Sequence, residues 1–327
     1  MKKQKVTLIE VAELAGVSRA AAGKVLNGGS DKIGVGAEAR KRILEAARKL
    51  NYQPNMAASI LAGGSSRLIG VLLDPGTSYR YLRLLGEIES LCQEQGYRII
   101  TSFTHENIVN MEENYRTLLR YGVSGVICCA HDYPGMQTGT LDFFSEENNI
   151  VFMEKPVCKG LRYVATSRVK ALTAMIASAQ ESGYRKIAMF SASLKWRTEA
   201  ALHEEFYQAM RRNGLEPDPH LVAAYPDEFS LPKRLNAMMD QVILPYHPDF
   251  VYIDDAVHAA ALQIRLLEHG IKIRIYGGND DPLFQGLGLS SFDPCYRKIA
   301  QAMLNLLMKP DIPEKMPVIE AVYRGCL

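Results

Sequence analysis

Residues 68–277 alternate between short apolar runs and longer stretches with apolar residues every three or four positions. The short runs are typical of buried strands, and the longer periodicity is typical of helices with one buried face. We expect strands at 68–73, 98–102, 125–130, 150–153, 186–191, 221–225, 250–253 and 274–277. We expect helices at 82–95, 111–121, 169–182, 198–213, 231–242 and 257–269. This alternation predicts two doubly wound parallel-sheet lobes, with a ligand cleft at the carboxyl ends of the strands.

Residues 7–27 show a different pattern, that of two short helices joined by a tight turn. Thr7 and Glu10 have the spacing of a reciprocal capping box, which begins a helix. Gly16 suits the positive φ of a tight turn, and Ser18 is the next N-cap residue. A second helix over 19–26 completes a helix-turn-helix, the pattern of many DNA-binding heads.

A third helix is expected over 37–50, with an inner stripe of Ile43, Leu44, Ala47 and Leu50. A three-helix bundle that binds protein is the alternative interpretation of this head. The charge favours DNA, because residues 1–66 hold eleven Lys or Arg and five Asp or Glu, a net charge of +6. The whole chain carries only +2, so the basic head is attached to a mildly acidic body.

The second helix would enter the major groove by its N-terminal end. There Arg19 suits a guanine edge, Ala20 suits a thymine methyl, and Lys24 suits a base or a phosphate. The other candidate DNA-binding residues in this segment are Thr7, Ser18 and Asn27.

The segments VTLIEVAELAGVSRAAAGKVLN (6–27) and ILEAARKLNYQPNMAASILAGGSSRLIGVLL (43–73) resemble the LacI/GalR family of transcription regulators. The resemblance implies a hinge helix that folds on the operator, with Leu61 as a wedge between base steps in the minor groove and Asn55 as a further DNA contact. Interdomain packing is the alternative role for Leu61. A longer loop at 28–36 and the alanine-rich recognition helix depart from the family and leave the operator sequence open.

The resemblance extends through the body, at Gly96-Tyr97, 123–127 and 182–192. It implies a small all-α helix-turn-helix head at 1–54, a hinge helix and linker at 55–66, and an α/β periplasmic-binding-protein-like body at 67–327. The body would bind the effector between its two lobes and hold the homodimer. The candidate effector-binding residues are Tyr79, Tyr81, His131, Asp132, Glu154, Trp196, Arg197, Asp254 and Asn279.

Asp254 stands where the family usually has Asn, and Asn279 stands where it usually has Asp. A family Asp is replaced in the stretch Ser167-Arg168, and Leu202 stands near a family Arg that Arg197 would replace from the loop. These departures disfavour an unmodified hexose. The expected effector is a sugar or sugar derivative, and a purine-like corepressor is the alternative.

The chain lacks the signatures of other function classes. It has no apolar run of the roughly 18 residues that span a bilayer, and no signal-peptide pattern, which predicts a cytoplasmic protein without a membrane partner. The absent signal-peptide pattern and the fused DNA-binding head also disfavour a solute-binding receptor. Its six cysteines have no metal-ligand spacing, and no phosphate-binding or nucleophile motif occurs. We therefore expect no enzyme activity, no cofactor and no metal, and a homodimer that binds a pseudo-palindromic double-stranded DNA operator.

Overall fold

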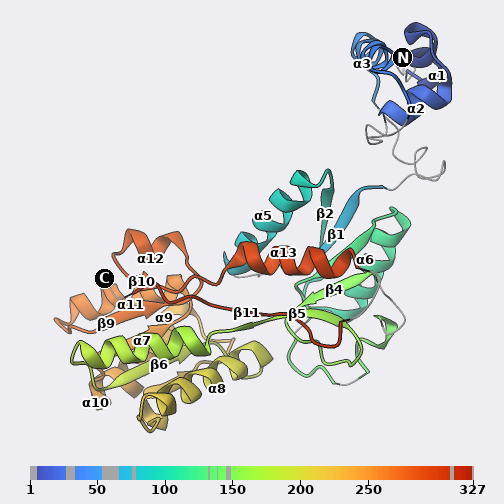
Figure 1. Cartoon of the computed structure of the whole chain (residues 1–327). Helices are drawn as coiled ribbons and strands as arrows, with labels where there is room; N and C mark the ends of the chain where they lie inside the picture. The colour runs from blue at the N-terminus through green and yellow to red at the C-terminus, as the bar shows by residue number, and fades with distance from the viewer. Residues whose placement is uncertain are drawn as a thin grey trace. The chain divides into compact units, whose positions relative to one another are not determined.

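The computed structural model describes residues 6–26, 34–53, 66–75, 79–131, 133–137, 139–144, 149–309 and 313–325. The chain divides into two compact units, Met1–Arg67 (unit 1) and Leu68–Leu327 (unit 2) (Figure 1). Within the described ranges, no helix is long and apolar enough to cross a membrane.

Unit 1 contains the three helices expected from the sequence: α1 (Leu8–Ala15), α2 (Arg19–Leu26) and α3 (Ala37–Lys49). The capping box is confirmed, because the Thr7 amide donates to Glu10 Oε2 at 2.7 Å and the Glu10 amide donates to Thr7 Oγ1 at 3.4 Å. Gly16 has φ 62° and ends α1, and Ser18 Oγ accepts the Ala21 amide at 3.1 Å at the start of α2.

The core of unit 1 is small and rich in alanine. Its buried residues are Val11, Ala12, Ala15, Ala22, Ile43, Ala46 and Ala47. The expectation that Leu44 lies on the inner stripe is wrong, because Leu44 is 41% exposed. One helical residue turns by about 100°, so the inner stripe of α3 runs through Ile43, Ala46 and Ala47 instead.

Unit 2 consists of two parallel α/β lobes. Lobe 1 has a six-stranded sheet in the order β11-β5-β4-β3-β1-β2, and lobe 2 has a five-stranded sheet in the order β10-β9-β8-β6-β7. The strands of lobe 1 are β1 (Leu68–Leu73), β2 (Arg98–Phe103), β3 (Gly125–Cys128), β4 (Ile150–Met153), β5 (Arg162–Ser167) and β11 (Val318–Glu320). The strands of lobe 2 are β6 (Ile187–Ser191), β7 (Val222–Ala224), β8 (Phe250–Ile253), β9 (Arg274–Gly277) and β10 (Ser290–Ser291).

Helices cover both faces of each sheet. Those of lobe 1 are α5 (Tyr79–Glu94), α6 (Ile108–Arg120) and α13 (Tyr296–Leu307). Those of lobe 2 are α7 (Val169–Glu181), α8 (Arg197–Arg212), α9 (Leu231–Met238), the π-helical turn Met239–Ile243, α10 (Leu244–Tyr246), α11 (Ala256–Glu268) and α12 (Pro282–Gly286). Short 3-10 turns lie at Asp142–Phe144 and Pro219–Leu221.

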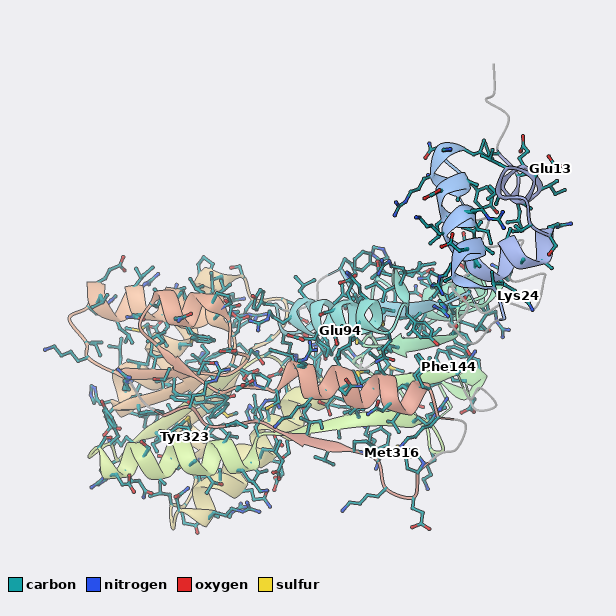
Figure 2. The ribbon with its side chains drawn as sticks, turned by 45° about the horizontal axis from the view of Figure 1, so that its top comes forward. Glu13, Lys24, Glu94, Phe144, Met316 and Tyr323 are labelled. Carbon is teal, nitrogen blue, oxygen red and sulfur yellow. The ribbon has the colours of Figure 1, made fainter. Side chains whose placement is uncertain are left out.

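Each sheet is packed between two apolar layers. In lobe 1, Phe144 belongs to one layer and Met316 packs against the other, and Tyr323 packs in lobe 2 (Figure 2). The chain passes between the lobes after β5, after β10 and after β11. Because three separate segments join the lobes, a rotation of one lobe on the other bends all three together.

Candidate ligand cleft and nucleic-acid interface

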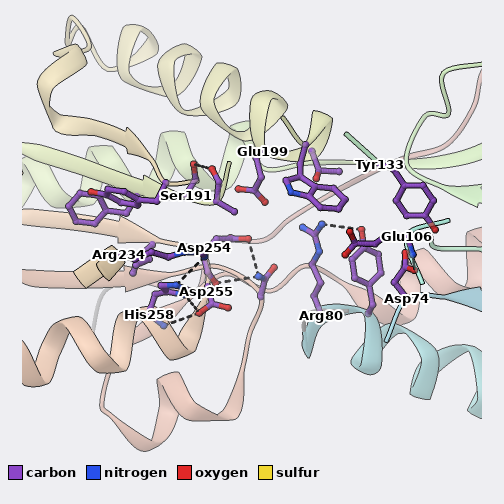
Figure 3. Close-up of a pocket in the computed structure, with 18 of the residues that line it drawn as sticks. Asp74, Arg80, Glu106, Tyr133, Ser191, Glu199, Arg234, Asp254, Asp255 and His258 are labelled. Atoms are coloured by element: carbon purple, nitrogen blue, oxygen red, sulfur yellow. Dashed lines mark hydrogen bonds and ion pairs between the residues drawn. The ribbon is translucent and has the colours of Figure 1, made fainter. Parts of the chain in front are cut away.

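A cleft of about 300 Å³ lies between the lobes, where the strands of both sheets end. Its polar side chains come from the loops after the strands and from the first turns of the helices that follow (Figure 3). Those of lobe 1 are Asp74, Arg80, Tyr81, Glu106, His131 and Tyr133. Those of lobe 2 include Ser191, Trp196, Glu199, Tyr225, Arg234, Asp254, Asp255, His258 and Asn279.

A hydrogen-bonded pair lies at the centre of the lobe 2 wall. Asn279 Nδ2 donates to Asp254 Oδ2 at 2.9 Å, and the Tyr252 hydroxyl donates to Asp254 Oδ1 at 2.6 Å. Gly278 is required beside this pair, because a Cβ there would lie 1.7 Å from Asp254 Oδ1. The carbonyl of Asn279 accepts the hydroxyl of Tyr296 at 2.8 Å. The pair is therefore fixed from both sides before any ligand arrives.

Arg80 approaches this wall from the first turn of α5 in lobe 1. Its guanidinium lies 4.7 Å from the centre of the Tyr81 ring, and Nη2 donates to the Tyr81 hydroxyl at 3.0 Å. Burial alone would lower the pKa of Arg80, but Tyr81, Asp254 and Glu199 raise it overall. Arg80 is thus a permanent cation that faces carboxylates of the opposite lobe.

Glu199 lies in the first turn of α8, where the helix dipole favours a negative charge. Burial and the charge of Asp254 raise its pKa, and Arg80 and Arg168 only partly offset this. Figure 3 shows its carboxylate directed towards Arg80 and Asp254. The surroundings of Glu199 therefore disfavour its ionised form.

A second group of charges lines the lobe 2 side of the cleft. His258 Nδ1 lies 2.5 Å from Asp255 Oδ1, and Arg234 Nη1 lies 3.3 Å from His258 Nε2. A guanidinium can only donate, so Nε2 of His258 accepts the hydrogen bond from Arg234. Nδ1 of His258 therefore carries the ring proton and donates a hydrogen bond to Asp255. Burial would raise the pKa of Asp255, but its hydrogen bonds from His258 lower it overall.

A smaller cavity of about 40 Å³ adjoins the cleft at the first crossover between the lobes. Glu154 lines it, with φ 69°, and its carboxylate accepts the amide of Thr166 at 3.2 Å and the hydroxyl of the same residue. Arg168 also lines it and pairs with Glu205, with Nη1 3.4 Å from Oε2. Burial raises the pKa of Glu154, and Thr166 and Arg168 oppose that shift.

The structure brings together most of the effector-binding candidates. Tyr81, His131, Trp196, Asp254 and Asn279 line the cleft, and Glu154 lines the adjoining cavity. Tyr79 and Arg197 lie outside both linings: each begins its helix, and Tyr79 turns outward to lie against Arg83. Asp132 falls outside the described residues.

Sequence reasoning missed Glu199, Tyr225, Arg234 and His258. Three of these lie within helices, whereas effector-binding side chains were expected in the loops after strands. The first turn of a helix that follows a strand also reaches the cleft, and this rule would have included Glu199 and His258.

In unit 1, helix α2 presents the candidate DNA-contact residues to solvent. Arg19, Ala20 and Lys24 are exposed on α2, and Figure 2 shows Lys24 on the surface of this unit. The hydroxyls of Thr7 and Ser18 act as helix caps. Asn27, Asn55 and Leu61, with the proposed hinge helix, fall outside the described residues.

Comparisons with known proteins agree with both units. Residues 7–55 match the family model described as bacterial regulatory proteins, lacI family. The chain is 33% identical over 179 residues to the sucrose operon repressor of Klebsiella pneumoniae, covering 54% of this chain and 52% of that protein. It therefore spans about half the length of that relative. It is 27% identical over 295 residues to the transcriptional regulator PtxS of Pseudomonas plecoglossicida, covering 89% of this chain and 80% of that protein.

Among solved structures, the lac repressor dimer bound to operator and the anti-inducer ONPF matches with a TM-score of 0.77 at 20% identity, over 99% of both chains. A complex of the regulator CelR with cellobiose matches with a TM-score of 0.64 at 18% identity, over 97% of this chain and 98% of that one. In this chain, a helix-turn-helix head is joined to a two-lobed α/β body with an interlobe cleft. Residues 7–55 thus match the lacI family of bacterial regulatory proteins, and the chain as a whole has the fold of the lac repressor structure.

Proposed function

We propose that this protein is a sequence-specific DNA-binding transcription regulator, acting mainly as a repressor, whose operator affinity is controlled by a small effector in the interlobe cleft. The observation that carries the proposal is the composition of the cleft walls. Arg80 and Tyr81 come from lobe 1, and Trp196, Asp254 and Asn279 come from lobe 2. A ligand that contacts both walls binds one lobe angle better than another, so it shifts the equilibrium between two lobe arrangements.

We assign DNA reading to α2, with Arg19 and Lys24 as its contacts in the major groove. Leu61 remains our proposed minor-groove wedge. The basic head supplies the sequence-independent attraction to phosphates, so operator binding should weaken as salt is raised. Because the proposed partner is chromosomal DNA, we place the protein in the cytoplasm.

We propose a homodimer held by unit 2. Helix α11 exposes Val257, Ile264 and Leu267 at 55%, 57% and 71%, and Leu283 of α12 is 40% exposed. Exposed apolar side chains along one element mark a protein interface. A second copy is the occupant we propose, since two heads are needed to read two operator half-sites.

We propose a carbohydrate or carbohydrate derivative as effector and release from the operator as its effect. An aromatic wall at Trp196 beside carboxylate and amide groups suits a hydroxylated ring. Purine-like corepression is the second candidate, supported by the matches to repressors named PurR, one of them 24% identical over 216 residues in Pasteurella multocida.

The test is a thermal-shift screen of the full chain with sugars, sugar acids and nucleobases, followed by operator binding with and without each ligand that binds. We expect one ligand class to raise the melting temperature and to change operator affinity. Trp196→Ala should abolish the response, whereas Leu194→Ala, in the same loop and 50% exposed, should not. If no small molecule changes either measurement, the sensor role is wrong, and if no DNA sequence is preferred, the regulator role is wrong.

A further inference from the structure

The described lining of the cleft has an excess of negative charge. Its carboxylates are Asp74, Glu106, Glu199, Asp254 and Asp255, against the two guanidiniums of Arg80 and Arg234. Charges in a partly closed cleft are screened less than charges on an open surface, so their interactions are stronger there. The excess of negative charge therefore favours a ligand that carries a positive charge.

Arg234 does little to reduce the excess near the centre of the cleft. Its Nε donates to the Phe229 carbonyl at 3.0 Å, and its Nη2 donates to the Asp227 carbonyl at 3.2 Å. Its Nη1 faces His258, which already donates to Asp255. These contacts link Arg234 to Asp255 through His258.

Arg80 is left as the single lining guanidinium that faces both Glu199 and Asp254. Figure 3 shows these three side chains directed into the same space. Asp254 is stabilised by Tyr252 and Asn279, but burial and Asp254 both disfavour the charge on Glu199. Arg168 also acts on both carboxylates, but its guanidinium pairs with Glu205, with Nη1 3.4 Å from Oε2. The two guanidiniums of Arg80 and Arg168 therefore face three carboxylates, which leaves a place for one more positive group.

Two other lining residues indicate how a ligand would be oriented. The Trp196 ring is held by a hydrogen bond from Nε1 to Asp227 Oδ2 at 3.1 Å, and an indole face attracts a cation. Tyr225 is 3% exposed, and its hydroxyl has no hydrogen-bond partner among the described residues. A buried hydroxyl without a partner costs free energy that a ligand hydroxyl would recover.

We propose that the effector is a small cation: a hydroxylated ring that carries an ammonium group, with the ammonium between Glu199 and Asp254 and beside Trp196. The Tyr225 hydroxyl takes a ligand hydroxyl. This assignment rests on the proposed sensor role of the cleft and specifies its ligand class. It excludes sugar acids and sugar phosphates, whose charge would add to the carboxylate excess.

The test compares three pyranoses that differ mainly in charge, glucosamine, glucose and glucuronate, by titration calorimetry on the full chain at neutral pH. A hydrogen bond to a charged group contributes about 1.5–3 kcal/mol, so we expect glucosamine to bind at least about tenfold more tightly than glucose. Glucuronate should bind most weakly. Glu199→Gln should reduce the binding of glucosamine by about tenfold or more and leave that of glucose nearly unchanged.

Glu204→Gln is the matched control, because Glu204 is exposed on the same helix and does not line the cleft. Equal or tighter binding of glucose or glucuronate would overturn the proposal, and so would the failure of all three to bind. Measuring operator binding in the same samples distinguishes a wrong ligand class from a wrong sensor role. A neutral or anionic ligand that changes operator affinity leaves the sensor role intact and refutes only the cationic class, whereas a bound ligand that never changes operator affinity refutes the sensor role.

Discussion

The side-chain amide of Asn279 donates to the carboxylate of Asp254, with Nδ2 2.9 Å from Oδ2. The resemblance to the LacI/GalR family assigns Asn to position 254 and Asp to position 279. The two residue types are exchanged in this chain, yet the amide and the carboxylate still meet across the ends of β8 and β9. The exchange moves the negative charge from the end of β9 to the end of β8. From there, the charge of Asp254 raises the pKa of Glu199.

The exchange predicts strong coupling between the two positions. Asn279→Asp would place two carboxylates at hydrogen-bond distance. Asp254→Asn would replace one of the two carboxylate oxygens that accept from Tyr252 and Asn279 with an NH2 group, which cannot accept. We expect each single variant to lose about 1–3 kcal/mol of unfolding free energy. The double variant should recover part of that loss, because it restores one amide and one carboxylate, and urea unfolding measures the cycle. Additive losses would show that the pair does not act as a unit.

The strand pattern was predictable wherever a strand is buried on both faces. β1, β4, β8 and β9 have the bounds expected from their apolar runs. β5 was missed because Arg162, Thr166 and Ser167 interrupt its apolar pattern, and β11 pairs with it at the edge of the sheet. The placement of α13 on lobe 1 depends on a chain crossing after β10, a long-range event that local periodicity does not encode.

The candidate site was best predictable near the ends of strands. His131, Glu154, Asp254 and Asn279 lie within three residues after a strand, and the carboxyl ends of parallel strands meet at one edge. Arg234 lies inside α9, and which helical face meets the cleft is set by packing against the sheet. The excess of negative charge in the cleft could not be predicted from the sequence. The chain is nearly neutral overall, and only the fold determines which carboxylates lie together.

Glu199→Gln should raise the melting temperature of the ligand-free chain at neutral pH. Burial and Asp254 raise the pKa of Glu199 in the folded state, so its ionised form costs stability above that pKa. The gain from the variant should shrink as pH falls through the raised pKa, and it should vanish below the ordinary pKa of about 4.3 for Glu, where both states are protonated. Melting curves from neutral to acidic pH check this, with Glu204→Gln as control. A variant that melts lower at neutral pH would show that Glu199 forms a net stabilising ion pair with Arg80.

Thr7→Ala should weaken the head without changing the body. The variant removes the oxygen that accepts the Glu10 amide, and a lost N-cap costs about 1 kcal/mol. Hydrogen exchange of the α1 amides in the full chain should accelerate, whereas exchange in β1 and β8 should not change. Thr7→Ser keeps the hydroxyl and should behave as the unmodified chain. If Thr7→Ala weakens operator binding without faster exchange in α1, the hydroxyl contacts DNA and its cap is secondary.

Arg19 and Lys24 should differ in what they contribute to operator binding, although both are exposed cations on α2. Arg19 lies at the N-terminal end of the helix, where its fork reaches a base edge, so Arg19→Ala should cost about 1–3 kcal/mol and relax the preference at one base pair. Lys24 lies in the last turn. If it contacts a phosphate, Lys24→Gln should weaken all sequences equally and reduce the salt slope by about one. Binding to a panel of single-base operator variants at several salt concentrations separates the two patterns. A uniform loss for Arg19→Ala would remove it from base reading, and the alanine-rich face of α2 would then leave Lys24 as the base-reading cation of the recognition helix.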